Sequence, residues 1–217
     1  MERLIRGYRE FRKKRWPVER TRYEALATKG QKPEYLIIAC SDSRSDPATI
    51  FNARPGEFFL IRNVAALVPP YEETNGYFGT RAAISYAVLS LNVRNIVVMG
   101  HAQCGGVAAA LDEHAAEGLP FLGEWLKLLK PAVIRAAAAG HGHAKNTKLE
   151  QEAVALSVER LLKYPFIEER VRHGRLAVDG LRFGIADGKL EMLNKSSGAF
   201  EPLDRRRRFI RWFARAA

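Results

Sequence analysis

The sequence predicts an α/β fold: a mainly parallel central sheet of four strands with an edge strand, flanked by helices and preceded by an N-terminal helical arm. Short apolar runs of strand length alternate with segments of helical pattern, which is typical of parallel sheets. Two of these runs, at 34–39 and 95–99, lead directly into groups of reactive side chains. Because open α/β sheets bind ligands at the carboxyl ends of their strands, we expect the functional site there.

Residues 1–30 are expected to form the helical arm. The pattern is helical up to a glycine that closes it, and the step from Trp16 to Pro17 interrupts it. We therefore expect two helices in the arm, over about 3–13 and 17–28.

Capping and turn residues place the elements that follow. Asp46 before Pro47 has the pattern of a helix start, and the proline–glycine pair at 55–56 turns the chain into a strand. An alanine-rich run after 104 favours a helix, and the segment 118–170 is almost entirely helical in pattern. The expected elements are strands at about 34–39, 57–62, 95–99, 176–183 and 189–193, and helices at about 47–51, 80–91 and 104–113.

A single domain is expected over 1–217. A chain of 217 residues with 47% hydrophobic content can bury a full core, and no internal repeat divides it. No apolar stretch reaches the roughly 18 residues of a membrane helix, and the charged N-terminus lacks the apolar segment of a secretory signal. The sequence therefore predicts a cytoplasmic protein without a membrane partner.

Basic residues concentrate at both ends of the chain and supply much of the formal net charge of +11. The segment 203–217 predicts a basic amphipathic C-terminal helix, in which Phe209, Trp212 and Phe213 share one face. Such ends can bind phosphates, but the aromatic spacing favours packing against a neighbour. We therefore do not expect nucleic acid as a partner.

Cys40, His101 and Cys104 are the candidate metal ligands. The chain has two cysteines, which excludes a four-sulfur site, and a reducing compartment favours metal ligation or catalysis over a disulfide. Thiolate and imidazole are the ligands that zinc prefers, and three protein ligands leave a coordination position open, as in catalytic zinc sites. Gly105 and Gly106 have no side chain and allow the backbone to approach the metal closely.

Asp42 and Arg44 follow Cys40 at two and four residues. One interpretation is a salt-bridged turn, which contributes little to stability if exposed. The other is a carboxylate beside the metal, kept ionised by a guanidinium that binds it bidentately. Such a carboxylate would accept a hydrogen bond from a metal-bound hydroxide and orient it toward an electrophile.

Together these residues resemble the β-class carbonic anhydrases. The resemblance covers nearly the whole chain, and its motifs are specific in combination. They are C-x-D-x-R at 40–44, PGE at 55–57, RNVA at 62–65, GHAQCGG at 100–106, EAV at 152–154 and YPF at 164–166.

The resemblance implies that Cys40, His101 and Cys104 bind zinc and that Asp42 joins them only in a closed state. Arg44 would pull Asp42 away from the metal and favour the active form. The implied reaction is the reversible hydration of carbon dioxide to bicarbonate and a proton by zinc-bound hydroxide.

The resemblance also implies a substrate pocket of the plant-like, non-allosteric type. Members of this type have a glutamine nine residues before the first cysteine, here Gln31, whose amide would hydrogen-bond bicarbonate or carbon dioxide. Phe59, Val64 and Tyr86 match the family's pocket, and Gly105 would offer its backbone N–H. Because some of these residues reach across a dimer interface in the family, a homodimer or homotetramer is implied.

A second site type in the family binds an inhibitory bicarbonate with tryptophan, arginine and tyrosine. The corresponding residues here are Ile37, Arg62 and Phe183. Since the indole and the phenol are missing, we do not expect inhibition of this kind.

Three alternatives remain open. A same-fold enzyme could hydrolyse carbonyl sulfide or carbon disulfide, because the metal centre alone does not distinguish these molecules from carbon dioxide. A non-catalytic zinc- or nucleic-acid-binding protein would use the basic ends but leaves the carboxylate–guanidinium pair unexplained. A cysteine hydrolase built on Cys104 and His101 would leave Cys40 without a role.

Overall fold

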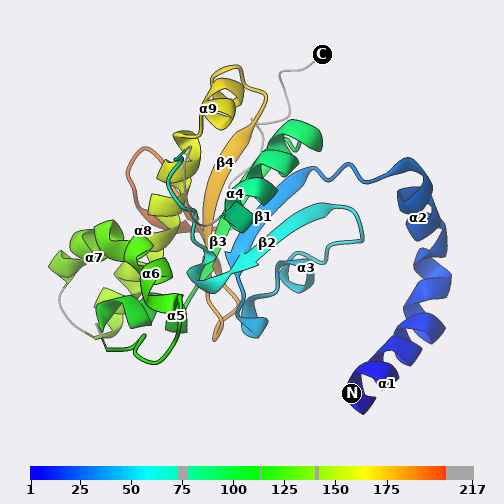
Figure 1. Cartoon of the computed structure of the whole chain (residues 1–217), viewed down its shortest axis with the longest axis horizontal. Coiled ribbons are helices and arrows are strands. Elements are labelled where there is room, and N and C mark those ends of the chain that lie inside the picture. The colour runs from blue at the N-terminus through cyan, green and yellow to red at the C-terminus, as the bar shows by residue number, and fades with distance from the viewer. Residues whose placement is uncertain (73–77, 113, 140–141, 204–217) are drawn as a thin grey trace.

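A computed structural model shows an α/β fold with a helical arm at its N-terminus (Figure 1) and describes residues 1–72, 78–112, 114–139 and 142–203. A six-stranded sheet in the order β2-β1-β3-β4-β5-β6 forms its centre. The strands are β1 (Tyr35–Cys40), β2 (Phe58–Asn63), β3 (Asn95–His101), β4 (Ala177–Phe183), β5 (Leu190–Leu193) and β6 (Phe200–Pro202).

The first four strands in sheet order are parallel, whereas β5 and β6 are antiparallel additions. The predicted α/β fold, with a mainly parallel sheet of four strands and an edge strand, is therefore confirmed. The sixth strand was not expected, because β6 has three residues and ends in a proline, a pattern too short and too irregular to indicate a strand.

Helices cover the sheet and form the arm. They are α1 (Glu2–Glu10), α2 (Trp16–Lys29), α3 (Pro47–Ile50), α4 (Phe78–Ser85), α5 (Gly105–Ala108), α6 (Leu122–Leu126), α7 (Lys130–Ala136), α8 (His143–Leu162) and α9 (Pro165–Arg172). The helix expected over 104–113 is shorter than predicted, because α5 tightens into a 3₁₀ turn that ends at Leu111. No helix in the described ranges is long and apolar enough to cross a membrane.

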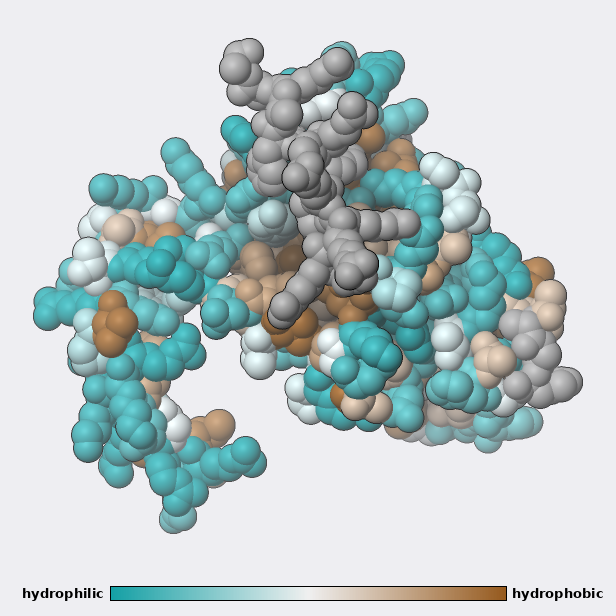
Figure 2. Space-filling view, turned by 180° about the vertical axis from the view of Figure 1, so that it is seen from behind, coloured by the Kyte–Doolittle hydropathy of each residue, from teal (hydrophilic) through white to brown (hydrophobic). Residues whose placement is uncertain are grey.

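The predicted break in the arm at Trp16 and Pro17 is wrong. A π-helical turn at Phe11–Arg15 joins α1 directly to α2, and Pro17 lies in the first turn of α2, where its missing N–H is tolerated. The arm extends away from the sheet (Figure 1), and none of its helical residues is buried. Its largely hydrophilic surface (Figure 2) carries exposed apolar side chains, among them Leu4, Ile5, Tyr8 and Val18.

Helix α8 packs directly on β3 and β4 because glycines leave room for it. A Cβ atom on Gly100 would lie 2.5 Å from Val154 Cγ2, and one on Gly180 would lie 2.8 Å from Val154 Cγ1. This close packing brings the first half of α8 next to the carboxyl end of β3. Of the C-terminal helix predicted over 203–217, all but the first residue lies outside the described residues.

Candidate metal centre

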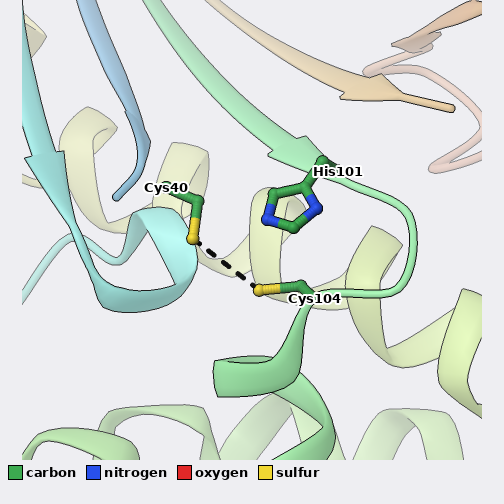
Figure 3. Close-up of side chains that lie close together, drawn as sticks. All are labelled: Cys40, His101 and Cys104. Carbon is green, nitrogen blue, oxygen red and sulfur yellow. Dashed lines mark hydrogen bonds between the residues drawn. The ribbon is translucent and has the colours of Figure 1, made fainter. Parts of the chain in front are cut away.

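The sheet and one tight loop bring the three predicted metal ligands together. Cys40 ends β1, His101 ends the adjacent parallel strand β3, and Cys104 immediately precedes α5. Their side chains point into one space (Figure 3), and their ligand atoms all lie within 4.8 Å of one another. All three residues are buried, with 1–6% of their surface exposed.

The distances within this cluster fit a zinc ion. The sulfur atoms of Cys40 and Cys104 are 3.9 Å apart, and tetrahedral zinc with ordinary Zn–S bonds holds two sulfurs about 3.8 Å apart. His101 Nδ1 is 2.8 Å from the carbonyl oxygen of Ala102. Because a carbonyl only accepts, Nδ1 carries the proton and Nε2 presents a lone pair.

His101 Nε2 is buried and has no hydrogen-bond partner in the part of the chain that the structure describes. Buried polar atoms are almost always paired, so an atom of this kind needs an explanation. A cation held between Nε2 and the two sulfurs would provide the missing partner.

The ionisation of the two thiols also favours the binding of a cation. The pKa of Cys40 falls to about 4, chiefly because its thiolate accepts a hydrogen bond from the Cys104 thiol. The pKa of Cys104 is raised by the same contact and by burial. The pair thus shares one proton, and a bound metal ion would allow both sulfurs to ionise.

Asp42 lies beside the cluster and is held by Arg44. Arg44 Nε donates to Asp42 Oδ1 at 3.0 Å and its Nη2 donates to Oδ2 at 2.7 Å, while the Arg44 backbone N–H donates to Oδ1 at 2.9 Å. These bonds from Arg44 hold the pKa of the Asp42 carboxyl well below its usual range. Asp42 Oδ2 is 3.8 Å from His101 Nε2, so one edge of the ionised carboxylate faces the candidate metal position.

Arg62 holds the backbone of the segment that carries Cys40 and Asp42. Its Nε donates to the carbonyl of Cys40 at 3.0 Å, its Nη2 to the carbonyl of Asp42 at 2.6 Å, and its Nη1 to Asp46 Oδ1 at 3.2 Å. The sequence singled out Arg62 through the RNVA motif and the second site type. Its contacts with the backbone of 40–42 could not be found from the sequence pattern.

The structure places two predicted pocket residues near the cluster. Gly105 follows Cys104 as the first residue of α5. Val64 directly follows β2, and a Cβ atom on Gly106 would lie 2.5 Å from Val64 Cγ1. Val64 therefore lies against the same turn that carries Cys104.

The other predicted pocket residues form a separate group at the opposite end of the sheet. The rings of Phe59 and Tyr86 are 5.8 Å apart, and Gln31 and Tyr86 both line an open pocket of about 700 Å³. Phe59 pairs with Leu36, four residues before Cys40, which corresponds to about 13 Å along a strand. Within one chain, this group is not brought to the metal-ligand candidates.

The chain is similar to known carbonic anhydrases over most of its length. The family model for carbonic anhydrase matches residues 35–190. The chain is 35% identical to Beta carbonic anhydrase 3 of Arabidopsis thaliana over 198 residues, which are 88% of this chain and 76% of that protein. It is 37% identical to the Arabidopsis thaliana protein Beta carbonic anhydrase 5, chloroplastic, over 83% of this chain and 60% of that protein.

Two solved structures are similar along most of the chain. The β-carbonic anhydrase CcaA superposes with a TM-score of 0.87 at 32% identity, covering 95% of this chain and 93% of that one. A tetrameric β-carbonic anhydrase of Sordaria macrospora superposes with a TM-score of 0.78 at 30% identity, covering 89% and 96%. The chain therefore belongs to the β-carbonic anhydrase family.

Proposed function

We propose that this protein catalyses the zinc-dependent, reversible hydration of carbon dioxide to bicarbonate and a proton. The observation that carries the proposal is the buried convergence of Cys40, His101 and Cys104 beside an ionised Asp42. Membership of the β-carbonic anhydrase family supports the same reaction.

Cys40, His101 and Cys104 would hold the zinc through two sulfurs and Nε2. When bound, zinc lowers the pKa of a coordinated water and so makes a nucleophile available near neutral pH. The Ala102 carbonyl keeps the proton of His101 on Nδ1, which leaves Nε2 free to act as a ligand.

Asp42 and Arg44 would orient the attacking oxygen. Asp42 Oδ2 accepts from Arg44 and has further lone-pair capacity on the side that faces the cluster. It can accept a hydrogen bond from the attacking oxygen and turn a lone pair of that oxygen toward the carbon of the substrate. Arg44 binds both carboxylate oxygens, which keeps Asp42 ionised and away from the metal position.

The substrate pocket is proposed to be completed by a second copy of the chain. Gln31, Phe59 and Tyr86 lie at the far end of the sheet from Cys40 in their own subunit. The arm exposes apolar side chains that its own chain does not bury, and a similar protein from Sordaria macrospora is tetrameric. A homodimer or homotetramer would bring these residues to a neighbouring metal centre next to Val64 and Gly105.

Zinc content per chain and stopped-flow hydration of carbon dioxide test the proposal, in the wild type and in Cys40→Ser. We expect about one zinc per wild-type chain, and the variant should lose both metal and activity. Full activity in a variant that no longer holds zinc would refute the site. Hydrolysis of carbonyl sulfide or carbon disulfide without carbon dioxide hydration would instead assign the sulfur substrates.

A cytoplasmic location is retained as a proposal from the sequence. One similar plant protein is named as chloroplastic, so fluorescence imaging of the tagged full-length chain is the direct test. Enclosure of the protein in an organelle would overturn the assignment.

A further inference from the structure

A buried carboxylate that the proposed reaction does not use touches the loop carrying Cys104. Glu150 lies in the first half of α8 and has 5% of its surface exposed. Its Oε1 accepts a hydrogen bond of 3.4 Å from the backbone N–H of Cys104. The other oxygen, Oε2, accepts hydrogen bonds from Arg182.

Arg182 of β4 fixes the orientation of this carboxylate. Its Nε and Nη2 both donate to Glu150 Oε2, at 2.9 and 2.6 Å. Both N–H groups therefore go to one oxygen, which leaves Oε1 facing the Cys104 amide. The pairing of Arg182 with Gly100 in the sheet register places the guanidinium next to the end of β3.

Arg182 is itself anchored from the neighbouring strand. Its Nη1 donates to Glu191 Oε2 of β5 at 2.9 Å, and 8% of the arginine's surface is exposed. A chain of contacts thus runs from the antiparallel edge of the sheet through Arg182 and Glu150 to Cys104. Each link is a charged or backbone hydrogen bond with a defined direction.

A buried ion pair is not explained by stability alone. Removing two charges from water is costly, and well-packed apolar residues often serve the fold equally well. The ion pair supplies a fixed geometry, which apolar residues would not supply. Hydrogen-bonded groups behind metal ligands orient those ligands, and their loss weakens metal binding.

We propose that Glu150 is a positioning residue for Cys104, and that Arg182 holds Glu150 in the orientation this requires. The pair fixes the backbone of Cys104 so that its sulfur faces the sulfur of Cys40 across the candidate metal position. The inference rests on the proposed zinc site and adds residues from α8 and β4 to it.

Glu150→Gln tests the inference because an amide has a single acceptor oxygen. That oxygen can serve the Cys104 N–H or Arg182 but not both, and an amide NH₂ turned toward Arg182 would oppose a donor with a donor. The matched control is Glu191→Gln, which neutralises the other carboxylate bound to Arg182. Its amide oxygen can still accept from Arg182 Nη1, so the anchor and the contact between Glu150 and Cys104 stay in place.

The measurement is the release of zinc from the loaded enzyme to a colorimetric chelator. We expect Glu150→Gln to release zinc about tenfold faster or more, whereas Glu191→Gln should release it at the wild-type rate. In the cobalt-substituted protein, the thiolate-to-metal absorption band should shift in Glu150→Gln and stay unchanged in the control. Equal rates and equal spectra in all three proteins would overturn the inference, and so would equal acceleration in both variants.

Arg182→Lys carries the test if Glu150→Gln does not fold. Lysine keeps the charge but lacks the two-pronged contact with Oε2, so zinc release should accelerate relative to the Glu191→Gln control. An unchanged rate in folded Arg182→Lys would reject the role of the pair. Failure of the wild type to bind zinc would reject the proposed function instead, so the two failures are distinguishable.

Discussion

Mixed oligomers of two inactive variants would show whether Gln31 serves the metal centre of the other subunit. Gln31 precedes β1, whereas Cys40 ends it, and the strand between them runs from Tyr35. Tyr35 and Cys40 are five steps apart along the strand, which corresponds to about 16 Å. Since Gln31 lies beyond the start of this strand, its amide does not reach the cluster in its own chain.

The expected magnitude follows from the symmetry of a dimer. A Cys40→Ser chain lacks a metal ligand, and a Gln31→Ala chain lacks the proposed substrate contact. In a hybrid dimer, one site combines the intact Cys40 of one chain with the intact Gln31 of the other. Random equal mixing makes half of the dimers hybrid, and one of two sites in each is intact, so about one quarter of wild-type activity should return.

The assay is stopped-flow carbon dioxide hydration before and after the two variants are unfolded, mixed and refolded with zinc. The control pair is Cys40→Ser with Asp42→Asn. Both of these changes fall in the same subunit's half of the site, so their hybrid has no intact site and should stay inactive. Differently tagged chains that co-purify would establish that hybrids form. Hybrids of Gln31→Ala and Cys40→Ser that show no more activity than the separate variants would refute the shared site.

Three further predictions concern single residues. Arg44→Ala should lower carbon dioxide hydration by about tenfold or more, because Asp42 loses its orientation. The melting temperature should change little, because the Arg44 side chain is about half exposed and such ion pairs contribute little to stability. Gly100→Ala should lower the unfolding free energy by about 1–3 kcal/mol, because its Cβ would meet Val154 Cγ2 at 2.5 Å. Denaturant titrations measure this change. Gly79→Ala is the control, because a Cβ added there would meet no neighbouring side chain within 4 Å. Tyr164→Phe should lower the unfolding free energy by about 1 kcal/mol, because it removes a buried hydroxyl that donates a 3.0 Å hydrogen bond to a backbone carbonyl. An unchanged denaturation midpoint would contradict this.

The strands and the metal-ligand cluster could be predicted because their signals are local. An apolar run that ends at Cys40 and another that ends near His101 indicate two buried strands, and parallel strands bring their carboxyl ends to one edge of the sheet. The H-x-x-C spacing then adds Cys104 through a turn of four residues. The prediction of this cluster therefore needs one contact between distant segments, the pairing of the two strands.

The supporting contacts could not be predicted because they join distant segments. Glu150 meets Cys104 across 46 positions of sequence, and Arg182 meets Glu150 across 32. Neither residue has a spacing that separates it from an ordinary surface charge. The arm differs from its prediction for a different reason. The sequence predicts a helix break at Pro17, but a π-helical turn before it offsets the backbone so that the proline falls in a first turn.

Arg44 joins the turn that carries Asp42 to the loop that carries Cys104, and thereby links the proposed orientation of the attacking oxygen to the position of a metal ligand. Gln103 adopts a left-handed conformation with φ of 55°, which is disfavoured for a residue with a side chain. Its carbonyl accepts a hydrogen bond from Arg44 Nη2 at 3.2 Å, and the same nitrogen donates to Asp42. The strained loop that carries Cys104 and the turn that carries Asp42 therefore share one guanidinium nitrogen. A change in the Cys104 loop should move Asp42 with it, so metal binding and carboxylate orientation are expected to respond together to substitutions on either side.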